Sequence, residues 1–173
     1  MKVMVEAIQA DITTLAVDAI VNAENEPLIM GGGVDGAIRR KAGPEMERDL
    51  RRIGRCLTGA AVITPGYRLP AKFVIHTVAP IWRGSDDEQE RLLVSCYSSA
   101  LNLADENDIR SMAFSAIGTG AYRWPAKRAS ELAFEAVTNH LIRGGRQDRI
   151  IFCCFSTDDR ERYTQLIRTQ SDA

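Results

Sequence analysis

Residues 18–42 read DAIVNAENEPLIMGGGVDGAIRRKA, a stretch that combines a short apolar segment, a triple glycine and an amphipathic segment. Residues 18–22 are mostly apolar and contain two β-branched side chains, which predicts a short buried strand. The glycines at positions 31–33 cannot continue a regular element. Apolar residues then recur every three or four positions over residues 34–42, and Gly43-Pro44 follows, so we expect a helix that ends there. The stretch therefore predicts a strand, a glycine-rich loop and a helix in direct succession.

The same alternation continues along the whole chain of 173 residues. We expect further strands at residues 3–8, 60–64, 72–78, 111–117 and 149–155, and further helices at residues 44–52, 88–106, 125–141 and 159–168. Several of these strands are apolar throughout, as strands covered on both faces are. The pattern predicts a three-layer α/β/α sandwich with a central mixed β-sheet. Because no linker or repeat divides the chain, we expect a single domain over residues 1–173.

Composition and charge narrow the class of protein. Hydrophobic residues make up 45% and charged residues 26%, and 22 basic against 23 acidic side chains give a net charge of -1. This balance argues against a strongly basic platform for nucleic acid. No apolar run approaches the ~18 residues of a membrane span, and Glu6 comes too early for a signal peptide. The four cysteines have no CxxC spacing, so we expect free thiols in a cytoplasmic protein without membrane contact.

Two glycine-rich loops are the first candidates for binding. In such a sheet ligands gather where the strands end. The glycines at 31–33 lie at a strand-to-helix junction, and Gly118-Thr119-Gly120-Ala121 repeats the arrangement after another strand. Without Cβ atoms the backbone can bring its N–H groups close to an anion, and the following helix adds its partial positive charge. The two loops indicate a diphosphate held by backbone amides, with tight turns alone as the alternative. Neither loop is a Walker A motif or a dinucleotide fingerprint.

Four side chains near these loops are candidates for contacts to the rest of the ligand. Asp11 can accept a hydrogen bond from an exocyclic amine such as adenine N6, or it caps a turn. Phe155 can present its face to a base, or it belongs to the core. Asn25 offers donors and acceptors to a vicinal diol, or it is a turn residue before Glu26-Pro27. Asp35 lies just after the triple glycine, where capping the helix and activating a water are compatible roles.

Six segments carry a more specific pattern. They are residues 18–25 (DAIVNAEN), 31–38 (GGGVDGAI), 58–59 (TG), 69–72 (LPAK), 74–78 (VIHTV) and 116–120 (AIGTG). In this order and spacing they resemble the macro domain, in particular its MacroD-type branch, and the resemblance covers essentially the whole chain. Within that branch the chain is most similar to the bacterial O-acetyl-ADP-ribose deacetylases.

The resemblance implies an ADP-ribose site. Asp11 and Ile12 would hold adenine, and Phe155 would stack on it or flank it. Residues of both glycine loops would wrap the diphosphate and the distal ribose. These are Gly32, Gly33, Val34, Asp35, Gly118, Thr119, Gly120, Ala121 and Tyr122.

The resemblance also implies a reaction at this site. Asn25 would bind the distal ribose hydroxyls and Tyr122 would fix that ribose. Asp35, a carboxylate near its ordinary pKa, would act as the base for the attacking water or would position it. The implied activity is the deacetylation of O-acetyl-ADP-ribose, a hydrolysis that needs neither a metal nor a cofactor.

Two other functions remain open at the level of the sequence. The same pocket could remove mono-ADP-ribose from acidic side chains of proteins, since that bond is also an ester of the distal ribose. Alternatively, the chain is an ADP-ribose-binding regulatory module with little catalysis, for example an inhibitor of ribonuclease III. The arginine-rich residues 48–55 would then be a contact face, unless they form the solvated side of a helix.

The sequence departs from the usual family pattern at several positions. They are Ala10 for Gly, Glu24 for a small residue, Arg39 for His, Gly118 for Ser, and Arg123-Trp124 for a Gly-aromatic pair. We expect Glu24 to add negative charge close to the anionic ligand, and Arg123 either to compensate it or to contact phosphate. His76 matches no site position and is expected to be structural.

Overall fold

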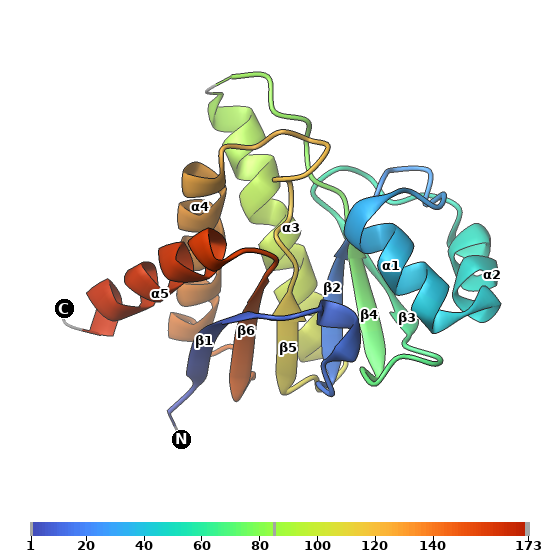
Figure 1. Ribbon diagram of the computed structural model, residues 1–173, viewed down its shortest axis with the longest axis horizontal. Coiled ribbons are helices and arrows are strands. Elements are labelled where there is room, and N and C mark those ends of the chain that lie inside the picture. Colours follow the sequence, from blue (N-terminus) through green and yellow to red (C-terminus); the bar gives the residue numbers. More distant parts are fainter. Residues whose placement is uncertain (1, 85, 172–173) are drawn as a thin grey trace.

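The computed structural model describes residues 2–84 and 86–171 and contains a mixed six-stranded sheet (Figure 1). Its strands lie in the order β1-β6-β5-β2-β4-β3. Neighbouring strands are parallel except β4 and β3, which pair antiparallel at one edge. The strands are β1 (Met4–Gln9), β2 (Ala19–Ala23), β3 (Ala61–Pro65), β4 (Phe73–Thr77), β5 (Ser111–Phe114) and β6 (Arg149–Cys154).

Helices cover both faces of this sheet. They are a short 3-10 helix η1 (Ile12–Thr14), α1 (Gly33–Ala42), α2 (Pro44–Ile53), α3 (Asp87–Glu106), α4 (Ala126–Ile142) and α5 (Thr157–Ser171). In the described part of the chain, no helix is long and apolar enough to cross a membrane.

Two separate apolar cores, one on each face of the sheet, define the three layers. Side chains alternate along a strand, so consecutive residues of β2 point to opposite faces. Ile20 lies in one core with Ile38 of α1, and Val21 lies in the other with Tyr97 of α3. Helices α4 and α5 join the second core, where Tyr163 stacks on Phe152 at 4.2 Å between ring centroids. This arrangement confirms the predicted α/β/α sandwich with a central mixed sheet.

The observed bounds follow the predicted ones to within three residues, and the largest differences lie at the end of α5 and at the end of β5. The strand predicted over residues 111–117 ends at Phe114. Ser115 donates to the Val21 carbonyl from both its N–H (3.3 Å) and its hydroxyl (2.7 Å), and the chain then leaves the sheet. Ile117 is fully buried although it lies outside the strand. The run of apolar residues therefore predicted the burial of this segment correctly, but it predicted a strand longer than the part that pairs in the sheet.

Candidate functional site

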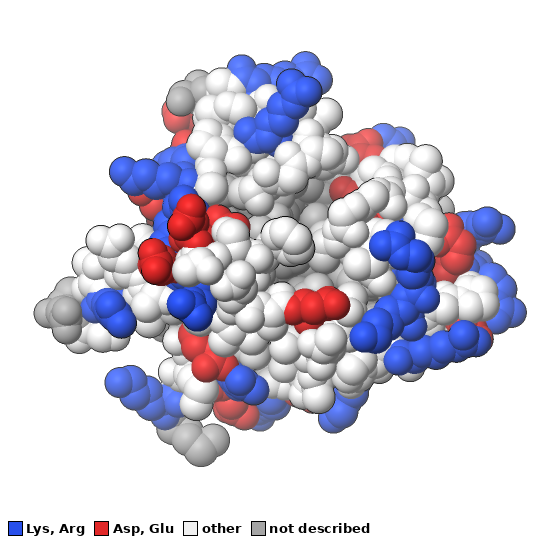
Figure 2. All heavy atoms as spheres, in the orientation of Figure 1, with Lys and Arg blue, Asp and Glu red and all other residues white. Residues whose placement is uncertain are grey.

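The predicted site segments meet at the edge of the sheet where the parallel strands end. The first glycine loop follows β2, the second follows β5, and Phe155 follows β6 directly. Asp11 and Ile12 come after β1, where η1 lies next to α1. Figure 2 shows a surface hollowed between the loop after β5, at the top of the view, and the segment that leads into α1. The two glycine loops thus lie on either side of one depression.

The first glycine loop presents the start of α1. Gly32 is the N-cap and makes no side-chain cap, and Gly33 has a φ of +55°, which favours glycine. The first N–H to donate into the helix is that of Gly36, to the Gly32 carbonyl at 3.3 Å. The preceding N–H groups of Gly33, Val34 and Asp35 cannot bond within the helix, and they make no hydrogen bond to another described residue. Three amides at a helix N-terminus are suited to binding an anion.

Asp35 lies in the first turn of α1, with only 4% of its surface exposed. Its Oδ2 accepts a hydrogen bond from the Gly31 N–H at 2.7 Å. Its Oδ1 accepts from Asn22 Nδ2 at 2.9 Å and from Arg39 Nε at 2.8 Å. The alternative prediction that Asp35 caps α1 is wrong, because Gly32 is the cap. Asp35 instead fixes the loop that precedes the helix.

These contacts change the pKa of Asp35. Burial raises the pKa of this carboxyl, but hydrogen bonds from Asn22, Gly31 and Arg39 outweigh burial and lower it below the ordinary value of 3.8. The expectation of an ordinary pKa is therefore wrong. A carboxylate with a lowered pKa is a weaker base. Asp35 is accordingly better suited to orienting a water or a hydroxyl than to removing a proton.

The second glycine loop is held by aromatic side chains. Gly118 has a φ of +86°, and a Cβ built there would lie 2.8 Å from Trp124 Cδ1. The Trp124 N–H donates to the Gly118 carbonyl at 3.0 Å, and its indole Nε1 donates to the Pro80 carbonyl at 2.8 Å. Trp82 packs on Trp124 with ring centroids 4.8 Å apart. Glycine at position 118 and tryptophan at position 124 therefore fit each other.

The second loop also presents free amides. The Arg123 N–H closes the turn by donating to the Gly120 carbonyl at 3.0 Å. For the N–H groups of residues 119–122, the described parts of the chain offer no acceptor. Gly120 is exposed, and a Cβ there would meet nothing within 4 Å. This loop resembles the first in what it offers to an anion.

Tyr122 and Asn25 are the two residues predicted to bind the distal ribose. Tyr122 is half-buried, and its carbonyl accepts from the Trp82 N–H at 2.8 Å. Burial and the charges of Glu24 and Glu26 raise the pKa of its hydroxyl. The side chain of Asn25 donates to the Ile29 carbonyl at 2.8 Å and accepts from the Ile29 N–H at 3.0 Å. Asn25 is therefore a turn residue, and its contact with a ribose stays a prediction.

The three residues predicted to hold adenine differ in exposure. Asp11 is exposed, and its Oδ1 accepts from the N–H (3.0 Å) and the hydroxyl (2.7 Å) of Thr13, which lowers its pKa. The turn-cap interpretation is confirmed, and it leaves Asp11 Oδ2 for a ligand. Ile12 is 6% exposed and belongs to the core between the sheet and α1, so a contact of its side chain with adenine stays a prediction. Phe155 is 94% exposed, which rules out the core alternative.

A buried polar network lies beneath the first loop. Glu24, 3% exposed, accepts two hydrogen bonds from Arg39 NH2 at 2.7 and 2.8 Å. The prediction that Arg123 compensates Glu24 is wrong, because Glu24 is buried and paired with Arg39. A contact of Arg123 with phosphate stays a prediction. His76 is fully buried between Glu24 (3.1 Å) and Thr64 (2.9 Å), which confirms its structural role.

Sequence reasoning missed two residues that contact Asp35. Asn22 is the one polar residue of the otherwise apolar strand β2, next to its last residue, and a polar residue in that place was the available signal. Arg39 lies four positions after Asp35 on the predicted helix, the spacing at which opposite charges pair on one face. The sequence shows Arg39 as a departure from the family pattern but does not show its partner Glu24.

The arrangement can do two things chemically. Two sets of free amides, at 33–35 and 119–122, can hold an anionic group between them without a lysine. A buried, ionised Asp35 lies beside the first set and can orient a polar group. After β1, Asp11 offers a hydrogen-bond acceptor, and after β6 the exposed Phe155 offers an aromatic face.

Comparison with known proteins agrees with this geometry. The family model described as "Macro domain" matches residues 21–133. A macro domain-containing protein of Chlorobaculum tepidum is 50% identical over 165 residues, which cover 95% of this chain and 96% of that protein. An O-acetyl-ADP-ribose deacetylase of Salmonella gallinarum is 46% identical over 171 residues, with 96% of each chain covered.

Solved structures show the same likeness. The Oceanobacillus iheyensis macrodomain with ADP has a TM-score of 0.92 and 35% identity, covering 97% of this chain and 92% of that one. The Trypanosoma brucei macrodomain in complex with ADP-ribose has a TM-score of 0.88 and 38% identity, covering 94% of this chain and 68% of that one. Both likenesses extend over nearly the whole of the present sheet and its helices.

Proposed function

Since this chain belongs to the macro domain family, we propose that it binds ADP-ribose and hydrolyses the ester of O-acetyl-ADP-ribose. The observation that carries the proposal is the pair of loops with free amides on either side of one depression, with Asp35 next to the first of them. The relatives named O-acetyl-ADP-ribose deacetylase are 44–46% identical over nearly the whole chain, and they support the reaction as well as the ligand.

We place the ligand along the edge of the sheet. Adenine lies between Phe155 and Asp11, with its exocyclic amine toward the free Oδ2 of that carboxylate. The diphosphate lies between the amides of 33–35 and those of 119–122, where opposed helix and turn amides compensate its charge. The distal ribose then lies near Asp35, Tyr122 and Asn25. For Asn25 the proposal requires that part of its bonding with Ile29 is exchanged for the ribose.

In the proposed reaction a water attacks the acyl carbon of the distal ribose ester. The bond from that carbon to the ribose oxygen breaks, the water oxygen becomes part of acetate, and the ribose hydroxyl regains a proton. Asp35 orients the water or a neighbouring hydroxyl through its carboxylate, because its lowered pKa makes it a poor acceptor for a full proton. The ligand's own phosphate is the other base within reach. Fixed geometry supplies much of the remaining acceleration.

Removal of mono-ADP-ribose from acidic side chains of proteins follows from the same chemistry, and we propose it as a second activity of the site.

Regulation of ribonuclease III stays a prediction that rests on the exposed arginines of 48–55. A cytoplasmic location also stays a prediction; the four cysteines are buried free thiols, which a reducing compartment would preserve.

The proposal is tested by calorimetry with ADP-ribose beside a deacetylation assay on the same preparation. We expect binding with a stoichiometry of one and release of acetate from O-acetyl-ADP-ribose, both unchanged by EDTA since no metal takes part. Binding without release of acetate would leave a regulatory module. Absence of binding would remove the proposal altogether.

A further inference from the structure

The two residues that depart from the family pattern near the first loop contact each other in the structure. Glu24 follows β2, and Arg39 lies on α1, fifteen positions later. Both oxygens of Glu24 accept from Arg39 NH2, at 2.7 and 2.8 Å. The two side chains are 0% and 1% exposed. Two departures that form one fully buried ion pair are one feature of this chain, not two.

We propose that Glu24 and Arg39 are a matched pair of positioning residues that hold Asp35 in its reactive orientation. The inference rests on the proposed function, because it assigns the pair a part in the same hydrolysis. Both side chains of the pair are buried away from the surface. The pair acts through the carboxylate of Asp35, which accepts a hydrogen bond from Arg39.

Hydrogen bonds lead directly from the pair to the first glycine loop. Arg39 Nε donates to Asp35 Oδ1 at 2.8 Å, in the same plane of donors that binds Glu24. Asn22 Nδ2 bridges the two carboxylates, at 3.2 Å from Glu24 Oε1 and 2.9 Å from Asp35 Oδ1. With Oδ1 fixed from below, Oδ2 points to the Gly31 N–H at 2.7 Å. A change at Glu24 therefore reaches Gly31 through three successive hydrogen bonds.

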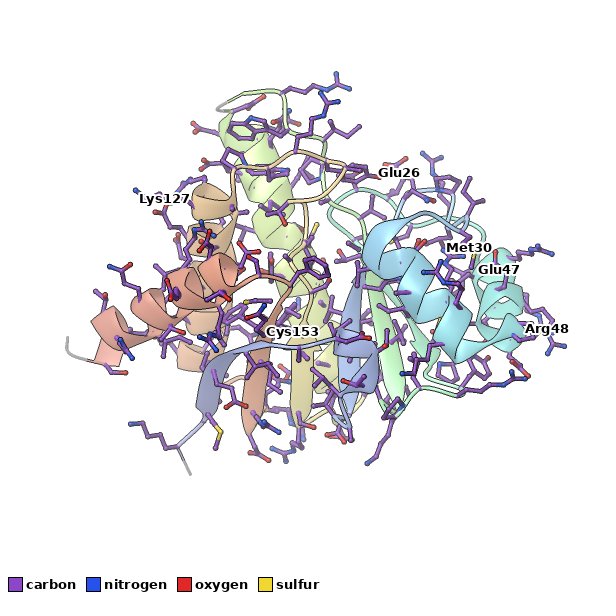
Figure 3. All side chains as sticks on the ribbon, in the orientation of Figure 1. Glu26, Met30, Glu47, Arg48, Lys127 and Cys153 are labelled. Carbon is purple, nitrogen blue, oxygen red and sulfur yellow. The ribbon has the colours of Figure 1, made fainter. Side chains whose placement is uncertain are left out.

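Neighbouring elements fix the pair from the other sides. Glu47 of α2, labelled in Figure 3, accepts from Arg39 NH1 at 2.8 Å and so completes the guanidinium fork. His76 of β4 lies 3.1 Å from Glu24 Oε1, and Thr64 of β3 holds the other ring nitrogen of His76 at 2.9 Å. Three neighbouring elements thus hold the pair: α2 and β4 directly, and β3 through His76. Such a site allows little variation in where Arg39 Nε points.

Each member of the pair makes the other necessary. Without Arg39, Glu24 would be a buried carboxylate close to Asp35, and two like charges at one site disfavour ionisation. Without Glu24, one nitrogen of the buried guanidinium would lose both of its acceptors. A small residue at position 24 with histidine at position 39, the usual family pattern, avoids both problems.

Stability alone does not account for the pair. Taking both charges out of water costs about as much as their attraction returns, so a buried ion pair is weak evidence for a gain in stability. What a rigid fork of donors does supply is direction, because guanidinium bonds are planar and fixed in angle. Here the guanidinium directs its Nε–H to Asp35 Oδ1 and so fixes the position of that oxygen.

The test is a double-mutant cycle on O-acetyl-ADP-ribose turnover, with Glu24→Ala, Arg39→His and the double variant. We expect each single variant to lose about 10- to 100-fold in kcat, the scale of a misplaced catalytic group. ADP-ribose affinity should stay within several-fold, and the double variant should recover kcat to within several-fold of the starting protein. Equal or additive losses in the double variant would overturn the proposal.

Further variants keep the result interpretable if a single variant folds poorly. Arg39→Lys retains the charge and removes the fork, so it should fold and still lose kcat; full kcat in folded Arg39→Lys would count against positioning. Glu6→Gln breaks an ion pair with Arg149 (2.8 Å) near the start of β6 and is the matched control. Its kcat should not change.

A readout that does not depend on turnover separates this proposal from the proposed function. The amide proton and nitrogen shifts of Gly31 report its bond to Asp35 Oδ2 directly. They should move in each single variant and return in the double variant, even if the protein released no acetate at all. Gly31 shifts that stay fixed in the single variants would contradict the positioning role, whatever the fate of the hydrolase activity.

Discussion

The two glycine loops offer an anion the same backbone groups, yet different forces hold them in place. The first lies over buried charge: Asp35 bonds the Gly31 N–H and is itself fixed by Arg39 and Asn22. The second lies against aromatic rings, and the indole of Trp124 occupies the space that a side chain at position 118 would need. No ionised side chain among the described residues bonds to the backbone of residues 118–122.

This difference suggests a division of labour. A loop held by a carboxylate can place that carboxylate against a substrate, so the first loop carries both binding and chemistry. A loop held by packing supplies shape and amides alone. The predictions below separate the two loops by removing what holds each of them.

The largest effect is expected from Asp35→Ala. Deacetylation should fall by about 10²- to 10⁴-fold, because the group that orients the water is lost. ADP-ribose affinity should change by only several-fold, since the amides of the first turn remain. Stability should fall by about 1–3 kcal/mol, because buried donors of Asn22 and Arg39 lose an acceptor. Acetate release and calorimetry on one preparation check this; unchanged turnover would remove Asp35 from the mechanism.

A smaller effect, on binding and stability together, is expected from Gly118→Ser. A serine at a φ of +86° is strained by about 1–2 kcal/mol, and its Cβ would lie 2.8 Å from Trp124 Cδ1. The melting temperature should drop by about 3–8 °C, and ADP-ribose affinity should fall by about 10- to 100-fold as the loop shifts.

Gly120→Ser is the matched control for that variant. A Cβ at position 120 meets nothing within 4 Å, and its backbone is not in the left-handed region. Its melting temperature should stay within about 1 °C, as for ordinary surface changes. Equal melting temperatures for the two serine variants would show that Trp124 does not constrain the second loop.

Phe155→Ala should weaken ADP-ribose binding by about tenfold, the scale of one base–aromatic stack. The melting temperature should not fall, because this side chain is 94% exposed and leaves no cavity. Calorimetry with ADP-ribose and with a ribose phosphate lacking the base checks the assignment. A loss of equal size for both ligands would place adenine elsewhere.

The smallest effect is expected from mild acid. The pKa of Asp35 is lowered in the folded protein, so the stability it contributes is fully present above about pH 4 and is lost only as the pH falls through the lower folded value. Glu24 behaves in the opposite sense: burial raises its pKa above 4.5, so it takes up a proton first. Carboxyl carbon shifts should show no titration of Asp35 between pH 7 and pH 5. A midpoint for Asp35 in that interval would contradict its network of donors.

The sequence predicted the elements of the fold well because they depend on local pattern. The periodicity of residues 34–42 and the glycines before them determine α1 wherever it lies in space. Its prediction for residues 111–117 failed at the end, where the side-chain bond of Ser115 to Val21 ended the ladder. Such a bond depends on a strand far away in sequence.

The candidate site was predicted only in part, for the same physical reason. Exposed backbone amides follow from glycine and a helix start, and these are local. The partners of Glu24 are not, since Arg39 reaches it across a loop and His76 comes from another strand. Trp124 was noted as a departure, but its contact with Gly118 requires the turn to be closed. Contacts between residues that are far apart in the sequence cannot be predicted from local sequence pattern.

The central claim is that both loops hold the diphosphate of ADP-ribose through their amides. Backbone amide shifts of the uniformly ¹⁵N-labelled protein, titrated with ADP-ribose and separately with adenosine, test it most directly. We expect the amides of 33–35 and 119–122 to shift together at saturating ADP-ribose and to stay nearly unchanged with adenosine, which lacks the diphosphate. Shifts confined to one loop, or equal shifts with adenosine, would contradict the account.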